Sequence, residues 1–307
     1  MRYISDLHEG DQVSEIYLCK TKSPGTSKFG KSYYSLTLQD KTGMIDGKVW
    51  ELTNAIGHFE AMDYILVRGQ VTSYQGSNQL NIQQIRKAQE GEFDMADYMP
   101  STKKDIDGMF KELLAMINKT KNQYLKQLAE KNFAREFKVH SAAKSVHHGY
   151  IGGLLEHSLS VAKICESYAS LYPQLNRDLI VMCALWHDMG KVEELSSFPE
   201  NDYTDEGQLV GHIVMGAIKL DRLIREIPGF PPKLANEVKH CMLAHHGELE
   251  FGSPKKPALL EAIALSQADN LDAKMETFAE IMEKQKEDQE WSGFQRLLDT
   301  RIRKTSI

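Results

Sequence analysis

The chain has 307 residues and a formal net charge of −6 at pH 7, so no overall basic field indicates nucleic-acid binding, and any such surface must be local. Its hydrophobic and charged fractions, 41% and 26%, are typical of a globular protein, and its length favours two domains. The four cysteines are far apart and form no C-x-x-C pair. Free thiols in a reducing cytoplasm are therefore expected. No apolar run is long enough to span a membrane, so we expect a cytoplasmic protein.

Between residues 11 and 87 apolar and polar side chains alternate, which predicts half-buried strands. In the fourth of these, Ile65, Val67, Gly69 and Val71 alternate with Leu66, Arg68, Gln70 and Thr72. A short helical piece at about Leu52–Phe59 is expected after the third strand. Five strands with a helix between the third and the fourth is the order of an OB-fold. We therefore assign residues 1–90 to a five-stranded OB-fold barrel.

The first loop of this barrel combines cationic and aromatic side chains, as do sequence-tolerant single-strand binding proteins. The alternative is that half of the rings are core and the lysines are merely solvated, and the nearly balanced charge of the domain favours this alternative. Trp50 is a weaker candidate for base stacking, because its ring fits the barrel core equally well. We predict nucleic-acid binding by this domain, with contacts from Lys22, Lys28, Phe29, Lys31 and Tyr33.

Residues 91–104 are acidic at first, contain a proline and have no period, which predicts a linker. From residue 105 to residue 307 apolar side chains recur at helical spacing, which predicts an all-α domain. Near its end, Trp291, Phe294 and Leu297 form an apolar edge on an otherwise charged helix. We expect this edge to pack into the core, and the alternative is a subunit contact in a homo-oligomer.

The helical domain contains one adjacent His-Asp pair at the end of an apolar helical run: His187 and Asp188. Gly190 then offers a left-handed helix stop. Adjacent helical residues point about 100° apart, so both reach one ion only where the helix meets a cleft. Further chemistry-bearing residues fall on other predicted helices or at their ends, namely His157, His212, His245, His246 and Asp269. Each alone is best interpreted as a hydrogen-bonded core residue, but burying all of them without partners would cost several kcal/mol per group. Binding to a metal ion removes that cost.

The order His…His-Asp…His…His-His…Asp resembles that of the HD-domain metal-dependent phosphohydrolases, over roughly residues 140–274. The resemblance implies an all-α bundle. It also implies one ion held by His157, His187, Asp188 and Asp269, and a second held by His212, His245 and His246 with Asp188 bridging. Mixed imidazole and carboxylate ligands suit Mn, Fe, Co or Zn. Two such ions can stabilise both the attacking and the leaving oxygen of a phosphodiester.

Other polar residues near these positions are candidates for substrate contacts. Lys191 follows Asp188 by about one helical turn and is expected to neutralise charge on a phosphate oxygen, with a solvated lysine as the alternative. Lys144, His147 and His148 precede the first ligand and are expected to contact phosphates, with ordinary helix-end residues as the alternative. Glu156 and Glu248 are candidates for orienting imidazoles.

The whole chain, an OB-fold followed by an HD domain, resembles the YhaM-type 3′→5′ exoribonucleases of Gram-positive bacteria. This resemblance implies release of 5′-mononucleotides from single-stranded RNA, and also from single-stranded DNA, with Mn²⁺ or Co²⁺ as the supporting ion and Fe or Zn as alternatives. Two other classes stay open from the residues. One is an HD phosphohydrolase acting on a nucleotide or cyclic dinucleotide, with a regulatory barrel. The other is a non-catalytic regulator that binds single-stranded nucleic acid.

Overall fold

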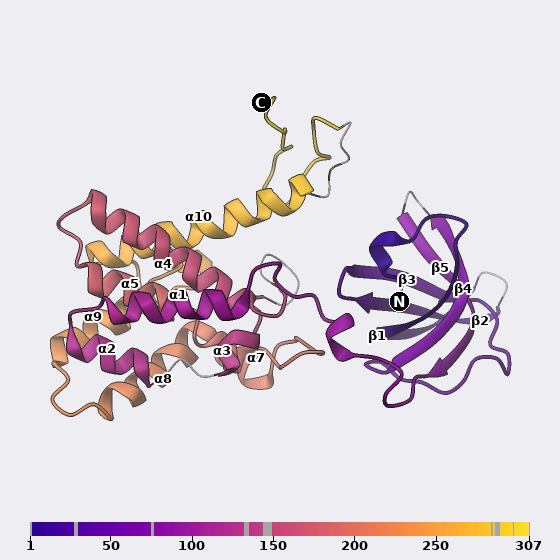
Figure 1. Ribbon diagram of the computed structural model, residues 1–307, viewed down its shortest axis with the longest axis horizontal. Helices are drawn as coiled ribbons and strands as arrows, with labels where there is room; N and C mark the ends of the chain where they lie inside the picture. The colour runs from indigo at the N-terminus through magenta and orange to yellow at the C-terminus, as the bar shows by residue number, and fades with distance from the viewer. Residues whose placement is uncertain are drawn as a thin grey trace. The chain divides into compact units, whose positions relative to one another are not determined.

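The computed structural model describes residues 2–27, 30–74, 77–131, 135–143, 149–283, 285, 289–296 and 298–306. The chain forms two compact units. One holds the residues up to Ser101 together with Phe198–Glu200, and the other holds the remainder. Strands make up the first unit and helices the second (Figure 1).

The first unit is a closed barrel in the strand order β1-β2-β3-β5-β4. Neighbouring strands are antiparallel, except for the parallel pair β3 and β5. This topology is that of an OB-fold, which confirms the prediction. The elements are η1 (Ile4–Asp6), β1 (Gln12–Thr26), β2 (Ser32–Asp40), β3 (Gly43–Val49), β4 (Tyr64–Tyr74), β5 (Ser77–Lys87) and η2 (Met95–Asp97).

The barrel core follows from the two-residue period of its strands. In β4 the side chains of Ile65, Val67 and Val71 are buried, whereas Arg68 between them is exposed. Gly69 takes the remaining inward position, where a Cβ atom would lie 2.2 Å from the carbonyl oxygen of Asn81 on β5. Only glycine therefore allows the two strands to approach so closely at this point.

The expected helix at Leu52–Phe59 is wrong: the described residues 51–60 contain a turn and no helix. The backbone of this segment pairs with β5 instead, through Gly57 N–H donating to Ile85 O (2.8 Å) and Ile85 N–H donating to Ala55 O (3.0 Å). Backbone groups bonded to a strand are not available for helical hydrogen bonds, and glycine inside a helix is unfavourable. Phe59 is nevertheless buried in the barrel core.

Part of the segment expected as a linker packs on the barrel. Phe93 stacks on Tyr64 of β4 with 4.0 Å between ring centroids, and Tyr98 contacts Tyr64 edge-on at 5.0 Å. Tyr98 is almost fully buried. These rings extend the apolar contacts of the barrel to the end of the first unit.

The second unit is all-α, as predicted; its described residues contain isolated β-bridges but no strand of the chain's sheet. Its central helix is α5, in which all eight residues from Leu179 to Trp186 are buried. Helices α4, α9 and α10 pack against α5 (Figure 1). The helices are α1 (Ile106–Asn118), α2 (Gln123–Glu130), α3 (Arg135–Val139), α4 (Gly153–Leu171), α5 (Arg177–Trp186), α6 (Lys191–Glu194), α7 (Asp205–Val210), α8 (His212–Arg225), α9 (Pro232–Leu243), η3 (Leu249–Phe251) and α10 (Leu260–Glu283).

The C-terminal prediction is wrong where it can be checked. Helix α10 ends at Glu283, and Trp291 and Phe294 lie in a non-helical segment with more than half of each side chain exposed. This segment bonds to the chain end, because Ser292 N–H donates to Ile302 O (2.7 Å). Leu297 lies outside the described residues. None of the described helices is long and apolar enough to cross a membrane.

We predict that Gly69→Ala lowers the free energy of unfolding of the barrel by about 1–3 kcal/mol, because the added methyl group must displace Asn81 backbone. Urea unfolding followed by tyrosine and tryptophan fluorescence measures the change. Gly293→Ala is the matched control, since a Cβ atom there meets nothing within 4 Å. Equal stabilities of the two variants would contradict the prediction.

Candidate metal centre

The seven predicted ligands lie close together in the helical unit, although they come from five helices or the residues that follow them. Their positions are His157 on α4, His187 and Asp188 directly after α5, His212 as the first residue of α8, His245 and His246 after α9, and Asp269 on α10. They form two groups that could each hold a metal ion: His157, His187 and Asp269, and His212, His245 and His246. In each group one ligand atom per residue lies within 4.8 Å of the others.

In the first group the Nε2 atoms of His157 and His187 are 3.1 Å apart. Asp269 Oδ1 lies 3.2 Å from His157 Nε2 and 3.7 Å from His187 Nε2. The three atoms thus face a common point, in a setting where both imidazoles are almost fully buried.

Asp188 lies between the two groups and faces both. Its Oδ2 atom is 3.5 Å from His157 Nε2 and 3.4 Å from His187 Nε2. Its Oδ1 atom is 3.5 Å from His212 Nε2 and 3.7 Å from His245 Nε2. One buried carboxylate therefore presents one oxygen to each group, which is the arrangement of a bridging ligand.

The five imidazoles are all oriented by a hydrogen bond at Nδ1, which leaves Nε2 directed at the centre. Three of them donate to backbone carbonyls: His187 to Ala184 O (2.7 Å), His245 to Met242 O (2.6 Å) and His246 to Phe251 O (2.8 Å). A carbonyl only accepts, so these three rings carry their proton on Nδ1 when neutral. The other two are held by carboxylates, His157 by Asp272 Oδ2 (2.7 Å) and His212 by Glu194 Oε1 (3.0 Å).

A cation fits this arrangement. Asp188 Oδ1, His212 Nε2 and His245 Nε2 are buried and have no hydrogen-bond partner in the part of the chain that the structure describes. Buried polar atoms without partners are costly, and all three are electron-pair donors aimed at the same space. Imidazole nitrogen and carboxylate oxygen together suit a divalent transition metal ion.

The pKa values show how this site is charged without a metal ion. Burial opposes ionisation of Asp188, but Lys191 and His187 hold its pKa well below the usual value. Burial also opposes protonation of His157, but Asp269 and Asp272 raise its pKa to about 10. Burial and His187 lower the pKa of His245. At neutral pH the carboxylates and His245 are therefore ready to bind a cation, and His157 must release a proton first.

Lys191, the first residue of α6, places its Nζ atom 2.7 Å from Asp188 Oδ2 and is largely buried. Gly190 before it is not the left-handed stop that was expected: it has φ −66° and ψ −22°. Glycine is needed there for a different reason, because a Cβ atom would lie 2.0 Å from His212 O. The close approach lets the start of α8 reach the Asp188 turn.

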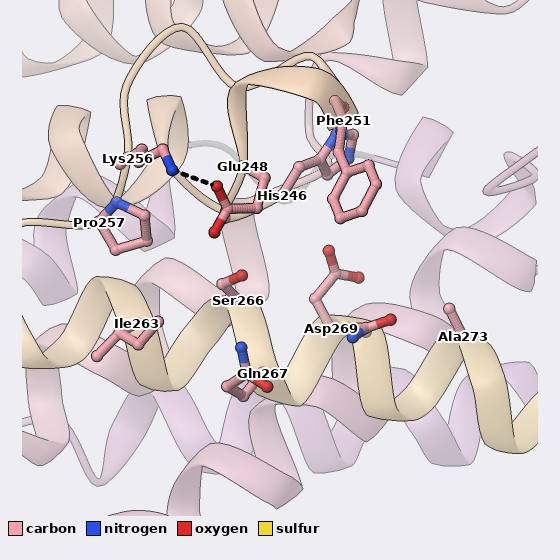
Figure 2. Close-up of a pocket in the computed structure, with 12 residues that line it drawn as sticks. His246, Glu248, Phe251, Lys256, Pro257, Ile263, Ser266, Gln267, Asp269 and Ala273 are labelled. Carbon is pink, nitrogen blue, oxygen red and sulfur yellow. Dashed lines mark hydrogen bonds and ion pairs between the residues drawn. The ribbon is translucent and has the colours of Figure 1, made fainter.

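A pocket of about 440 Å³ opens beside the centre, between the segment 246–257 and α10. Its lining includes His246 from one ligand group and Asp269 from the other. Figure 2 shows the Phe251 ring and the Asp269 carboxylate facing one another across this space. A substrate in the pocket would therefore have direct access to both groups.

Two acidic residues orient the ligands and were missed in the sequence: Asp272 and Glu194. Asp272 is three residues after Asp269 on one helix, so its spacing was a usable signal. Glu194 is 18 positions from His212, which gives no local signal.

Glu248, expected to orient an imidazole, instead pairs with Lys256 (2.6 Å) and is about half exposed. The described contacts of Glu156 are to Lys104 (2.7 Å), Tyr150 (3.1 Å) and Thr102.

The predicted substrate contacts are only partly described. Lys28, Phe29, Lys144, His147 and His148 lie outside the described residues. Lys22 donates to Phe59 O (2.6 Å) and lies over the Phe59 ring, so its contacts are within the barrel. Lys31 is exposed.

Tyr33 of the barrel packs against Trp50 with 4.9 Å between ring centroids. Trp50 itself is 45% exposed, which argues against a place in the core. Lys48 Nζ lies 5.6 Å from the Tyr33 ring centre and donates to Ser35 Oγ (2.6 Å). The barrel surface therefore carries two neighbouring rings beside a cation.

The helical unit with its paired His and Asp clusters defines a metal-binding HD domain, and residues 154–274 match the family model described as HD domain. This match implies that the domain binds divalent metal ions.

Curated proteins similar to the whole chain are named 3′-5′ exoribonuclease YhaM. The one from Bacillus velezensis is 36% identical over 275 residues, covering 88% of this chain and 87% of that protein. The one from Bacillus subtilis is 34% identical and covers 91% of each chain, and the one from Listeria innocua is 32% identical and covers 90% of each. The chain belongs to the YhaM family of 3′-5′ exoribonucleases.

We predict that Asp272→Asn weakens Mn²⁺ binding about 10- to 100-fold, because the charged partner that orients His157 is lost. Isothermal titration calorimetry measures the affinity, and thermal unfolding shows whether the variant is folded. Glu248→Gln is the control, since that carboxylate pairs with Lys256 and holds no imidazole of the described residues. An Asp272→Asn protein with the affinity of the wild type would show that this hydrogen bond does not support the site.

Proposed function

We propose that this protein is a metal-dependent 3′→5′ exoribonuclease that releases 5′-mononucleotides from single-stranded RNA, with single-stranded DNA as a further substrate. The observation that carries the proposal is Asp188, whose two oxygens face two separate groups of histidines. Relatives that match this chain over about nine tenths of its length are named 3′-5′ exoribonuclease, and this name supports the proposed direction of cleavage.

Two divalent ions are proposed, Mn²⁺ or Co²⁺ with Fe or Zn as alternatives. When bound, they would polarise the scissile phosphate and lower the pKa of the attacking water. His157, His187 and Asp269 would hold one ion, and His212, His245 and His246 the other, with Asp188 in contact with both. The Nδ1 hydrogen bonds keep each ring in place, so little reorganisation is needed when the site is filled.

Lys191 has two proposed tasks. Its ammonium group balances the buried charge of Asp188 at 2.7 Å, and its pKa is raised by that carboxylate in spite of burial. It is therefore charged when substrate arrives. From this position it faces the negative charge that develops on a phosphate oxygen during hydrolysis.

The barrel is proposed to bind the single strand ahead of the cleaved end. The exposed ring of Trp50 and the half-buried ring of Tyr33 beside it are surfaces on which bases can stack. Lys48 supplies positive charge at the Tyr33 ring, and the exposed Lys31 is two positions before Tyr33. Binding there raises the effective concentration of the strand end at the metal centre. Some substrate contacts stay predictions, namely those of Lys22, Lys28, Phe29, Lys144, His147 and His148. The domain boundaries also stay a prediction: a barrel of residues 1–90, a linker of residues 91–104 and a helical domain of residues 105–307.

A second candidate is an HD phosphohydrolase acting on a free nucleotide or cyclic dinucleotide, which the pocket volume of about 440 Å³ favours because small-ligand sites have this size. Competition between long RNA and free nucleotides separates it from an exonuclease. The open pocket at the ligand groups favours either enzyme over a non-catalytic regulator.

A cytoplasmic location is proposed from the four free, buried thiols, and association into a homo-oligomer stays a prediction.

We predict that the wild-type protein with Mn²⁺ shortens a 5′-labelled single-stranded RNA from its 3′ end, and that Asp188→Asn loses at least about 100-fold of this rate because the shared carboxylate charge is gone. Gel electrophoresis resolves the ladder of products. Asp107→Asn is the matched control and keeps the rate, because Asp107 is an exposed carboxylate on α1 that pairs with Lys138 of α3. Cleavage of free nucleotides but not of RNA would contradict the exonuclease and favour the second candidate.

We predict that Tyr33→Ala combined with Trp50→Ala raises KM for long single-stranded RNA about tenfold, because stacking on aromatic rings contributes about 1–3 kcal/mol per base. Initial rates on long RNA give the effect, and rates on a p-nitrophenyl phosphodiester report the metal centre alone. Tyr172→Ala, an exposed ring after α4, is the control. An equal loss on both substrates would mean that these rings support the fold rather than the strand.

A further inference from the structure

The pocket beside the metal centre has two walls of different character. One wall is the face of α10 on which Ile263, Ser266, Gln267 and Asn270 recur at helical spacing, together with the ligand Asp269. The other wall is the segment 246–257, which begins at the ligand His246. Each wall is thus anchored to a different ligand group, and the space between them is fixed relative to the metal centre.

Phe251 contributes an aromatic ring to the second wall. The side chain is 63% exposed, so it gains little from burial, while its backbone oxygen accepts the hydrogen bond that orients His246. The ring points from η3 toward α10 and Asp269 (Figure 2). An exposed ring tied in this way to a ligand is a stacking platform at a set distance from the reacting phosphate.

Gln267 and Asn270 contribute two amide groups to the first wall. Both side chains are exposed, and neither makes a hydrogen bond to any residue that the structure describes. They are three positions apart and so lie on the same face of α10. An amide offers both donors and an acceptor, which suits the edge of a base or a sugar hydroxyl rather than a phosphate.

The distribution of charge in the pocket favours different positions for the phosphate and for the nucleoside of a nucleotide. Lys256 is paired with Glu248 at 2.6 Å, as the dashed line in Figure 2 shows, so its positive charge is already balanced. A phosphate is therefore not attracted to this end, and it is directed instead to the His and Asp groups. The uncharged nucleoside suits the remaining space.

We propose that this pocket binds the nucleoside of the nucleotide being removed, with its base stacked on Phe251 and its edges hydrogen-bonded to Gln267 and Asn270. The inference rests on the proposed exonuclease function and assigns a subsite to it. Stacking is available to every base, and amides can match donors and acceptors alike. The pocket therefore accepts all four nucleotides at the 3′ end with similar affinity.

Two chromogenic esters isolate this subsite: thymidine 5′-(p-nitrophenyl phosphate) and methyl p-nitrophenyl phosphate. Both lose the same leaving group, but only the first carries a nucleoside. In Phe251→Leu the ratio of their kcat/KM values, nucleoside ester over methyl ester, is expected to fall about tenfold, and in Phe251→Tyr it is retained. Leu249→Ala is the control, because Leu249 is 58% exposed on the same η3 but does not line the pocket.

The outcomes distinguish the subsite from the activity itself. An unchanged ratio in Phe251→Leu, with RNA still cleaved, overturns the subsite and leaves the exonuclease intact. If the wild type hydrolyses neither RNA nor the esters, the proposed function fails, and calorimetric binding of uridine 5′-monophosphate to the Mn²⁺-loaded protein then decides the subsite. Binding that weakens about tenfold in Phe251→Leu but not in Leu249→Ala supports it, and equal or absent binding overturns it.

Discussion

The buried carboxylate of Asp188 is the constraint on which the helical unit depends. A charge with only 2% of its residue exposed is stable only if opposite charge or hydrogen bonds surround it. Lys191 balances one oxygen, while the other has no partner among the described residues and faces His212 and His245. The chain thus holds a partly compensated anion at the centre of its fold, and a divalent cation completes the compensation.

The helix ends that surround this carboxylate also orient its neighbours. The last carbonyl groups of a helix have no partner within the helix. In α5 and α9 these carbonyls belong to Ala184 and Met242, and each accepts the Nδ1–H of the histidine three residues later. The same hydrogen bond therefore satisfies a helix terminus and turns Nε2 of His187 or His245 toward the centre. Gly190 permits the close approach that brings His212 to the same place.

Periodicity was sufficient to predict the barrel and the all-α unit, because strands and helices bury one face at regular spacing. The order of histidines and aspartates resembles that of the HD-domain phosphohydrolases, and this resemblance predicted the two ligand groups that the structure brings together. Two features could not be predicted from local sequence patterns, because contacts between distant residues determine them. Gly57 pairs with β5 instead of forming a helix, and Glu194 contacts His212, which is 18 positions away in the sequence. Asp272 was within reach of the sequence, because it is one helical turn from Asp269.

The charge around the centre supports the proposal of two ions rather than one. The ligands Asp188 and Asp269 and the orienting residues Asp272 and Glu194 bring four negative charges, and Lys191 brings one positive charge. The site therefore has a formal charge of −3 when its histidines are neutral. One divalent ion would leave the site negative and repel a phosphodiester. Two would leave it at +1, which matches the single negative charge of the substrate. The charge of the substrate is thus balanced at its phosphate, so stacking and amide contacts alone can hold the nucleoside. Hydrolysis then need not depend on the identity of the base.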